Sequence, residues 1–176
     1  SIHNSKGLEF PVVFLAGTGG LFNPDSTKGD LLLHPEAGIG LVRRDPETLR
    51  QHNTLSRQAV SLAIRKSERA EELRVLYVAM TRAKEKLIMT MSVKDPASKL
   101  NRLAAALGEG ETLSPYLVLS SRSMGDWLLS TALRHPSGDL LRKMADSEDL
   151  SLCSADHPWK IEVLRAPSPA EAEKET

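Results

Sequence analysis

Two short apolar runs and one long amphipathic segment dominate the hydrophobic pattern. Residues 10–16 form an apolar run ended by the glycine-rich residues 17–20, which predicts a buried strand followed by a turn. Residues 86–92 predict a second strand. Between them, residues 54–80 predict a helix in one or two parts. Its apolar stripe, expected to pack on the sheet, comprises Leu73, Leu76, Tyr77 and Met80. The strand–helix–strand order predicts an α/β fold.

The remaining pattern predicts smaller elements. Residues 31–33 and 39–42 flank a turn and indicate a hairpin-like excursion. Further helices are expected at 97–107, from a cap at Ser123 to Pro136, and at 140–144, with a strand at 161–164. The polar, proline-containing residues 166–176 are expected to form a disordered tail or linker. We therefore divide the chain into 1–95, a mostly helical extension 96–165, and 166–176.

Composition restricts the class of protein without identifying it. The 176 residues have a formal net charge of zero and fit one domain, or one domain plus a tail. Residues 43–86 hold 11 Lys and Arg against 6 Asp and Glu, a weak indication of phosphate contact, for which a solvated helix face is the more common explanation. The single Cys153 excludes an intrachain disulfide, and no signal peptide or membrane-length apolar run is visible. We expect a cytoplasmic protein, and a chain starting without Met suggests a domain or a proteolytic fragment.

Arg82 follows the predicted long helix and has two interpretations. A cation at a helix C-terminus complements the helix dipole and can cap carbonyls. Alternatively, its planar fork could reach a phosphate, where phosphoryl transfer needs positive charge. Residue types alone leave both open.

The polar segment before the first strand is similarly ambiguous. His3, Ser5 and Lys6 lie near Gly7, and Glu9 directly precedes the apolar run. The simple interpretation is a surface loop entering a strand. The glycines at 17–20 lack the spacing and lysine of a phosphate-binding loop, so we interpret them as a turn. Neither a helicase-type acidic box nor a histidine spacing typical of metal sites is present, and no metal site is expected.

Two strings of residues nevertheless resemble a known family. Residues 1–10 read Ser-Ile-His-Asn-Ser-Lys-Gly-Leu-Glu-Phe, and residues 76–83 read Leu-Tyr-Val-Ala-Met-Thr-Arg-Ala. They resemble motifs V and VI of superfamily 1 DNA helicases of the UvrD/Rep type. Residues 38–42 and 122–128 extend the resemblance, over about residues 1–135, to the AddA family of subunits of bacterial AddAB helicase–nucleases.

The resemblance implies a partial RecA-like parallel sheet with flanking helices, and a role for several residues. Arg82 would be the catalytic arginine finger and would bind ATP, and Glu9 would contact the nucleotide ribose. Ser1 and His3 would contact the backbone of single-stranded DNA, and Lys6 would contribute to the same DNA site.

The implied function is that of an ATP-dependent 3′-to-5′ DNA helicase and exonuclease subunit in double-strand break repair and recombination. ATP and Mg²⁺ would be its cofactors, and DNA and an AddB-type subunit its partners. Without a phosphate loop, the chain alone is expected to be inactive, and its incomplete sheet is expected to favour an edge-strand homodimer. A non-catalytic, helicase-like scaffold is the alternative. A free-standing nucleotide-binding enzyme is disfavoured.

Overall fold

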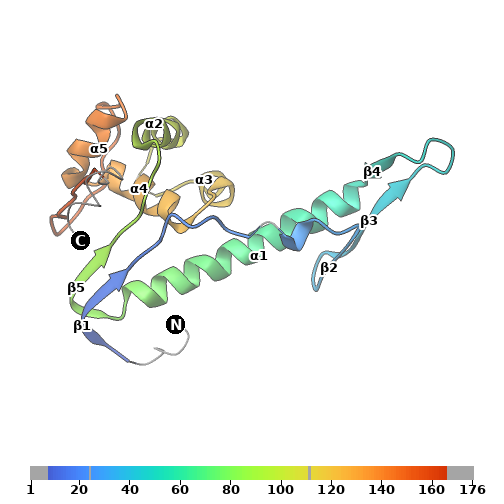
Figure 1. Cartoon of the computed structure of the whole chain (residues 1–176), viewed down its shortest axis with the longest axis horizontal. Coiled ribbons are helices and arrows are strands. Elements are labelled where there is room, and N and C mark those ends of the chain that lie inside the picture. The colour runs from blue at the N-terminus through green and yellow to red at the C-terminus, as the bar shows by residue number, and fades with distance from the viewer. Residues whose placement is uncertain (1–7, 24, 111, 166–176) are drawn as a thin grey trace, which may run out of the picture.

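The computed structural model describes residues 8–23, 25–110 and 112–165. Ser1, His3 and Lys6, and the predicted tail, lie outside these residues. A long helix runs through the molecule, with a parallel strand pair near its end, an antiparallel sheet near its start and a group of short helices on one side (Figure 1). The predicted mixed α/β class, with a small parallel sheet and flanking helices, is confirmed.

The parallel pair consists of β1 (Phe10–Leu15) and β5 (Ala83–Met89), as the two apolar runs predicted. Val13 lies opposite Leu87 and Leu15 opposite Met89. The register shifts between Phe10 and Val12, where Pro11 has no N–H to donate to a neighbouring strand. β5 begins three residues earlier than predicted, because Ala83 already pairs with Phe10 at the start of β1.

The connecting helix α1 (Leu55–Met80) is a single helix of 26 residues, about 39 Å long. Thr54 caps it, since its side-chain oxygen accepts a hydrogen bond from the backbone N–H of Arg57. The predicted packing stripe is only partly right. Leu76 is buried, but Leu73 is 37% and Tyr77 68% exposed, because the two described strands cover only a narrow part of the helix.

The N-terminal half of α1 packs on a three-stranded antiparallel sheet, which confirms the predicted hairpin. Its strands are β2 (Leu31–His34), β3 (Gly38–Arg44) and β4 (Gln51–Asn53), in that order. A short 3-10 helix, η2 (Asp25–Thr27), precedes β2. Gly40 faces α1 so closely that a Cβ there would lie 2.6 Å from Cα of Arg57. Glycine therefore sets the distance between this sheet and the helix.

The C-terminal lobe, residues 95–165 without 111, is a group of short helices. They are α2 (Pro96–Ala106), α3 (Pro115–Ser120), α4 (Met124–Arg134), η3 (Pro136–Gly138) and α5 (Asp139–Met144). Their aliphatic core is formed by Leu100, Leu103, Ala104, Ala132, Leu133, Leu141 and Ala145. The predicted strand at 161–164 is wrong: this segment joins neither of the described sheets, and Ile161 packs against the helical core instead.

The lobe is attached to the carboxyl ends of the parallel strands. The backbone N–H of Gly125, in the first turn of α4, donates to the carbonyl of Thr18 at 2.7 Å, and the Thr18 hydroxyl donates to the carbonyl of Thr90. Phe22 adds a contact to Trp127 on α4, with ring centroids 5.0 Å apart. These contacts fix the lobe to the segments that follow β1 and β5.

Candidate functional site

Arg82 lies where α1 passes directly into β5, at the amino ends of the parallel strands. Thr81 ends the helix, and its backbone N–H donates to the carbonyl of Tyr77. The carbonyl of Arg82 then accepts the N–H of Phe10 at 2.8 Å, the first rung of the ladder between β5 and β1. The position of the Arg82 backbone is therefore fixed by both the helix and the sheet.

The guanidinium of Arg82 is held by neutral acceptors. Nε donates to the carbonyl of Val78 at 3.1 Å, Nη1 to the carbonyl of Leu8 at 3.1 Å, and Nη2 to the hydroxyl of Thr81 at 3.3 Å. Within the described part of the chain, no carboxylate pairs with Arg82. Because neutral acceptors do not compensate its charge, the guanidinium can still attract an anion. It has five N–H donors, more than the three bonds named above use, so donors also remain for that anion.

Glu9 lies at the same end of the sheet, one residue before β1. Its carboxylate pairs with Nζ of Lys84 at 3.1 Å, and both side chains are more than half exposed. Such an exposed pair is worth about 0–1 kcal/mol and can open when either partner meets a ligand. The fold thus brings Glu9 and Arg82 to neighbouring strand ends. Lys84, which sequence reasoning did not select, completes the group.

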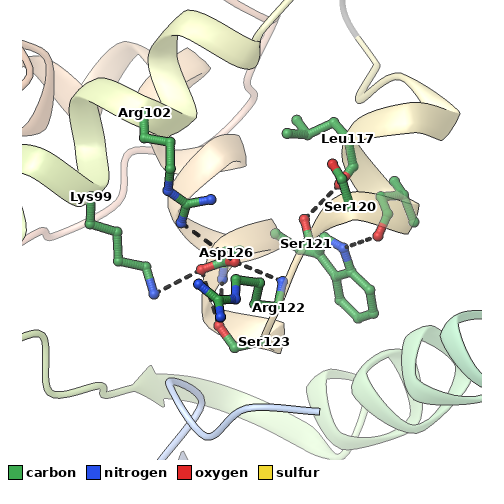
Figure 2. A network of polar contacts seen from close by, with 10 residues as sticks. Lys99, Arg102, Leu117, Ser120, Ser121, Arg122, Ser123 and Asp126 are labelled. Carbon is green, nitrogen blue, oxygen red and sulfur yellow. Dashed lines mark hydrogen bonds and ion pairs between the residues drawn. The ribbon is translucent and has the colours of Figure 1, made fainter. Parts of the chain in front are cut away.

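A second polar cluster lies in the C-terminal lobe around Asp126, which is 1% exposed. Figure 2 shows Lys99 and Arg102 of α2 reaching toward this carboxylate on α4. Nζ of Lys99 lies 2.7 Å from Oδ1, while Oδ2 accepts the backbone N–H of Arg122 at 2.8 Å. The hydroxyl of Ser123 also donates to Oδ1. Asp126 thus ties two helices and a helix cap together.

The charge of Asp126 is stabilised in place. Burial alone would favour the neutral acid, but the hydrogen bond and attraction of Lys99 and the N–H of Arg122 hold the pKa of the carboxyl below its ordinary value. Asp126 therefore has a structural role in the lobe. Sequence reasoning missed it, although Ser123 and Asp126 have the spacing of a capping box.

Neither a metal-binding cluster nor a membrane-spanning helix is found among the described residues. These residues contain no cluster of three or more His, Cys, Asp or Glu side chains suited to a metal ion. Among the helices that the structure describes, none has the length and apolar character needed to span a membrane.

Known proteins are similar to this chain over a range that includes both motif-like strings, residues 1–10 and 76–83. Residues 1–94 match the family model of the UvrD-like helicase C-terminal domain. The chain is 38% identical, over 99% of its length, to the AddA-type ATP-dependent helicase/nuclease subunit of Bacillus cytotoxicus, and 39% identical over 92% to that of Clostridium novyi. It spans only 15% and 13% of the lengths of these two relatives.

Proposed function

Because the chain belongs to the UvrD-like helicase C-terminal domain family, we propose that it is part of an AddA-type, ATP-dependent DNA helicase/nuclease subunit. The identity to subunits of that name over nearly the whole chain supports this proposal. In this proposal the full protein is a cytoplasmic enzyme of double-strand break repair and recombination. It acts on DNA and works with an AddB-type partner subunit.

The proposed role of Arg82 is to stabilise the negative charge that develops on the γ-phosphate during ATP hydrolysis. The single observation that carries this role is the guanidinium held by three neutral acceptors and unpaired with any described carboxylate. Such a group is oriented without losing its charge, which is what transition-state stabilisation requires. When bound, ATP would supply the phosphoryl group, and Mg²⁺ would help to neutralise its negative charge. Glu9, released from Lys84, would accept a hydrogen bond from the nucleotide ribose.

The DNA contacts rest on the resemblance alone. Ser1, His3 and Lys6 would meet the backbone of single-stranded DNA through a hydroxyl, an imidazole and an ammonium group, all suited to phosphate oxygens. They precede Glu9 by three to eight positions. One short segment would therefore couple movement of the bound DNA to the nucleotide contact of Glu9.

The test is steady-state ATPase activity of the full-length protein, with and without single-stranded DNA. Arg82→Ala is expected to lower stimulated turnover on the order of 10³-fold or more, and Arg82→Lys to recover only part of it, because an ammonium lacks the planar fork. Arg74→Ala is the matched control, since Arg74 is an exposed cation near the end of α1 that pairs with Glu71. His3→Ala should lose DNA stimulation and keep basal hydrolysis.

A non-catalytic scaffold is the second candidate, and one observation favours it. The bond from Nε of Arg82 to the carbonyl of Val78 is an ordinary helix cap. If Arg82→Ala kept near-normal stimulated turnover with normal circular dichroism, capping would be its whole role and the finger assignment would be wrong. The isolated chain is expected to hydrolyse no ATP, because an arginine finger has nothing to act on without a phosphate-binding loop.

An edge-strand homodimer of the isolated chain is also proposed. Phe10, Val12 and Phe14 of β1 are 41%, 44% and 70% exposed, so apolar side chains border a sheet with only two described strands. Light scattering at high concentration tests this proposal, and a monomer would refute it.

A further inference from the structure

The antiparallel sheet has an apolar face that nothing covers among the described residues. Leu31 lies opposite Leu41 and Leu33 opposite Ile39 in the register of β2 and β3. These four side chains, here called the outer patch, are 53–64% exposed. Because neighbours along a strand point to opposite faces, Leu32 and Gly40 face α1 while the outer patch faces away from it. Leu32 is accordingly 3% exposed.

The sequence of β2 is that of a strand covered on both faces. An antiparallel sheet with one solvated face normally alternates apolar and polar residues, whereas Leu31, Leu32 and Leu33 are continuous. The partner strand repeats the pattern, with Ile39 and Leu41 on the outer face. Aliphatic side chains in two adjacent cross-strand pairs make a contiguous patch of the kind that marks an interaction surface.

The outer patch is built on a rigid base. The Nδ1 atom of His34 accepts the backbone N–H groups of Glu36 and Ala37, which fixes the turn between β2 and β3. Its Nε2 atom lies 3.1 Å from the hydroxyl of Ser67 on α1, so the turn is also tied to the helix. A surface fixed in this way loses little conformational freedom when another surface covers it.

One end of the outer patch is cationic. Arg43 follows Leu41 by two positions on the same face, and His52 of β4 lies opposite Arg43. Arg43 is exposed and forms no ion pair within the described part of the chain. A complementary surface would therefore place a carboxylate at this end, beside aliphatic side chains.

The size of the patch favours a covering segment from the same polypeptide. A stable association between separate proteins buries about 800 Å² on each partner, far more than four aliphatic side chains supply. Two copies meeting through this face would also bring their cationic ends into one small interface. A segment of the same polypeptide needs less area, because its effective concentration is high. The chain spans about 15% of the length of its relatives, so a longer polypeptide offers many such segments.

We propose that the outer patch is an intramolecular packing surface for an amphipathic, acidic segment of the full-length polypeptide. This inference rests on the proposed function only in assuming a longer, AddA-type polypeptide. The segment covers Leu31, Leu33, Ile39 and Leu41 with aliphatic side chains and sets a carboxylate against Arg43. The sheet then becomes the middle layer between this segment and α1.

Photo-cross-linking of the full-length protein tests the proposal. A benzophenone amino acid replaces Leu33 in one variant and Leu49 in another. Leu49 is the matched control, since it is 74% exposed in the turn between β3 and β4. We expect the variant at Leu33 to give intramolecular cross-links to one apolar, acidic segment, and the variant at Leu49 to give none to it. Cross-links to a second copy or to a partner subunit, or no cross-link at all, would overturn the proposal.

Arg43→Glu in the background of the Leu33 variant tests the charge. The yield of the same cross-link should fall several-fold, and an unchanged yield would refute the acidic character of the segment. Neither measurement uses ATP hydrolysis or Arg82. A failure of the packing proposal is therefore distinguishable from a failure of the proposed arginine finger.

Discussion

Replacing Asp126 by Asn should destabilise the C-terminal lobe strongly although the two residues have nearly the same shape. The carboxylate is 1% exposed and accepts hydrogen bonds from Lys99, Ser123 and the backbone N–H of Arg122 (Figure 2). Asn substitutes an N–H₂ donor for one oxygen. In either orientation this donor meets another donor, either the ammonium of Lys99 or the N–H of Arg122.

The expected loss of unfolding free energy depends on the burial of Asp126 and on how freely the side chain of Lys99 can move. Removing one member of a buried ion pair costs about 3–5 kcal/mol, because the other charge is left without compensation. The side chain of Lys99 is 20% exposed and can turn toward water, which places the expected loss at the lower end, about 3 kcal/mol. Asp139→Asn is the control. Asp139 is 62% exposed and pairs with Lys143 one helical turn away, so its replacement should lower the free energy of unfolding far less than that of Asp126.

Urea unfolding followed by tryptophan fluorescence measures both variants. The two tryptophans of the chain, Trp127 and Trp159, both belong to the lobe, so the signal reports its unfolding. With a slope of about 1–3 kcal/mol per molar urea, the midpoint of Asp126→Asn should fall by roughly 1–3 M. A Lys99→Met double-mutant cycle isolates the pair itself. A midpoint for Asp126→Asn equal to that of Asp139→Asn would refute the reasoning.

Three further expectations concern the charge of Asp126 and the close packing of two glycines. The lowered pKa of Asp126 gives the folded lobe stability that is present above the ordinary value of 3.8 and is lost as the pH falls through the lowered pKa. In Asp126→Asn, the free energy of unfolding should therefore depend less on pH in the acid range, as urea unfolding at several pH values would measure. Gly40→Ala should cost about 1–3 kcal/mol, because its Cβ would lie 2.6 Å from Cα of Arg57, and faster hydrogen exchange confined to β2 and β3 would report it. Gly138→Ala should lower the urea midpoint of the lobe, since its Cβ would overlap the carbonyl oxygen of Ala132.

The hydrophobic pattern predicted those elements of the fold whose periodicity was clear along the sequence. The apolar runs indicated the two parallel strands, and the helical periodicity of residues 54–80 indicated α1, although it left open whether the helix has one part or two. The stripe on α1 was misjudged for a reason of tertiary structure. Spacing shows that Leu73 and Tyr77 share a face with Leu76, but only the width of the covering sheet decides which of them is buried.

Errors in the C-terminal lobe have similar causes. α3 was missed because its six residues are too few for a periodic pattern, although Ser114 before Pro115 is a typical helix start. Residues 161–164 are apolar enough for a strand, yet no described strand lies beside them to offer backbone partners, and Ile161 is used as a packing residue. Only Ile161 of this segment packs on the core, while Val163 and Leu164 are 45% and 83% exposed, so apolar composition alone predicted the strand wrongly.

The sequence proposed residues for the candidate site but gave no indication of their contacts. The family resemblance singled out Arg82 and Glu9, and the parallel register of β1 and β5 brings them to neighbouring strand ends. No pattern in the sequence indicates that Glu9 pairs with Lys84, or that Arg82 bonds to the carbonyl of Leu8, since both contacts depend on the offset between two distant strands.

The two ends of the parallel pair explain why such a site would lie at the amino end. In open α/β sheets, ligands usually bind beyond the carboxyl ends of the strands. Here that end is engaged by the C-terminal lobe, since Gly125 of α4 donates to Thr18 and the Thr18 hydroxyl donates to Thr90. The amino end instead presents the exposed charges of Glu9 and Lys84 beside the guanidinium of Arg82. A ligand bound there would contact the end of α1, whose other end supports the antiparallel sheet, so both surfaces proposed for binding are carried on one continuous helix.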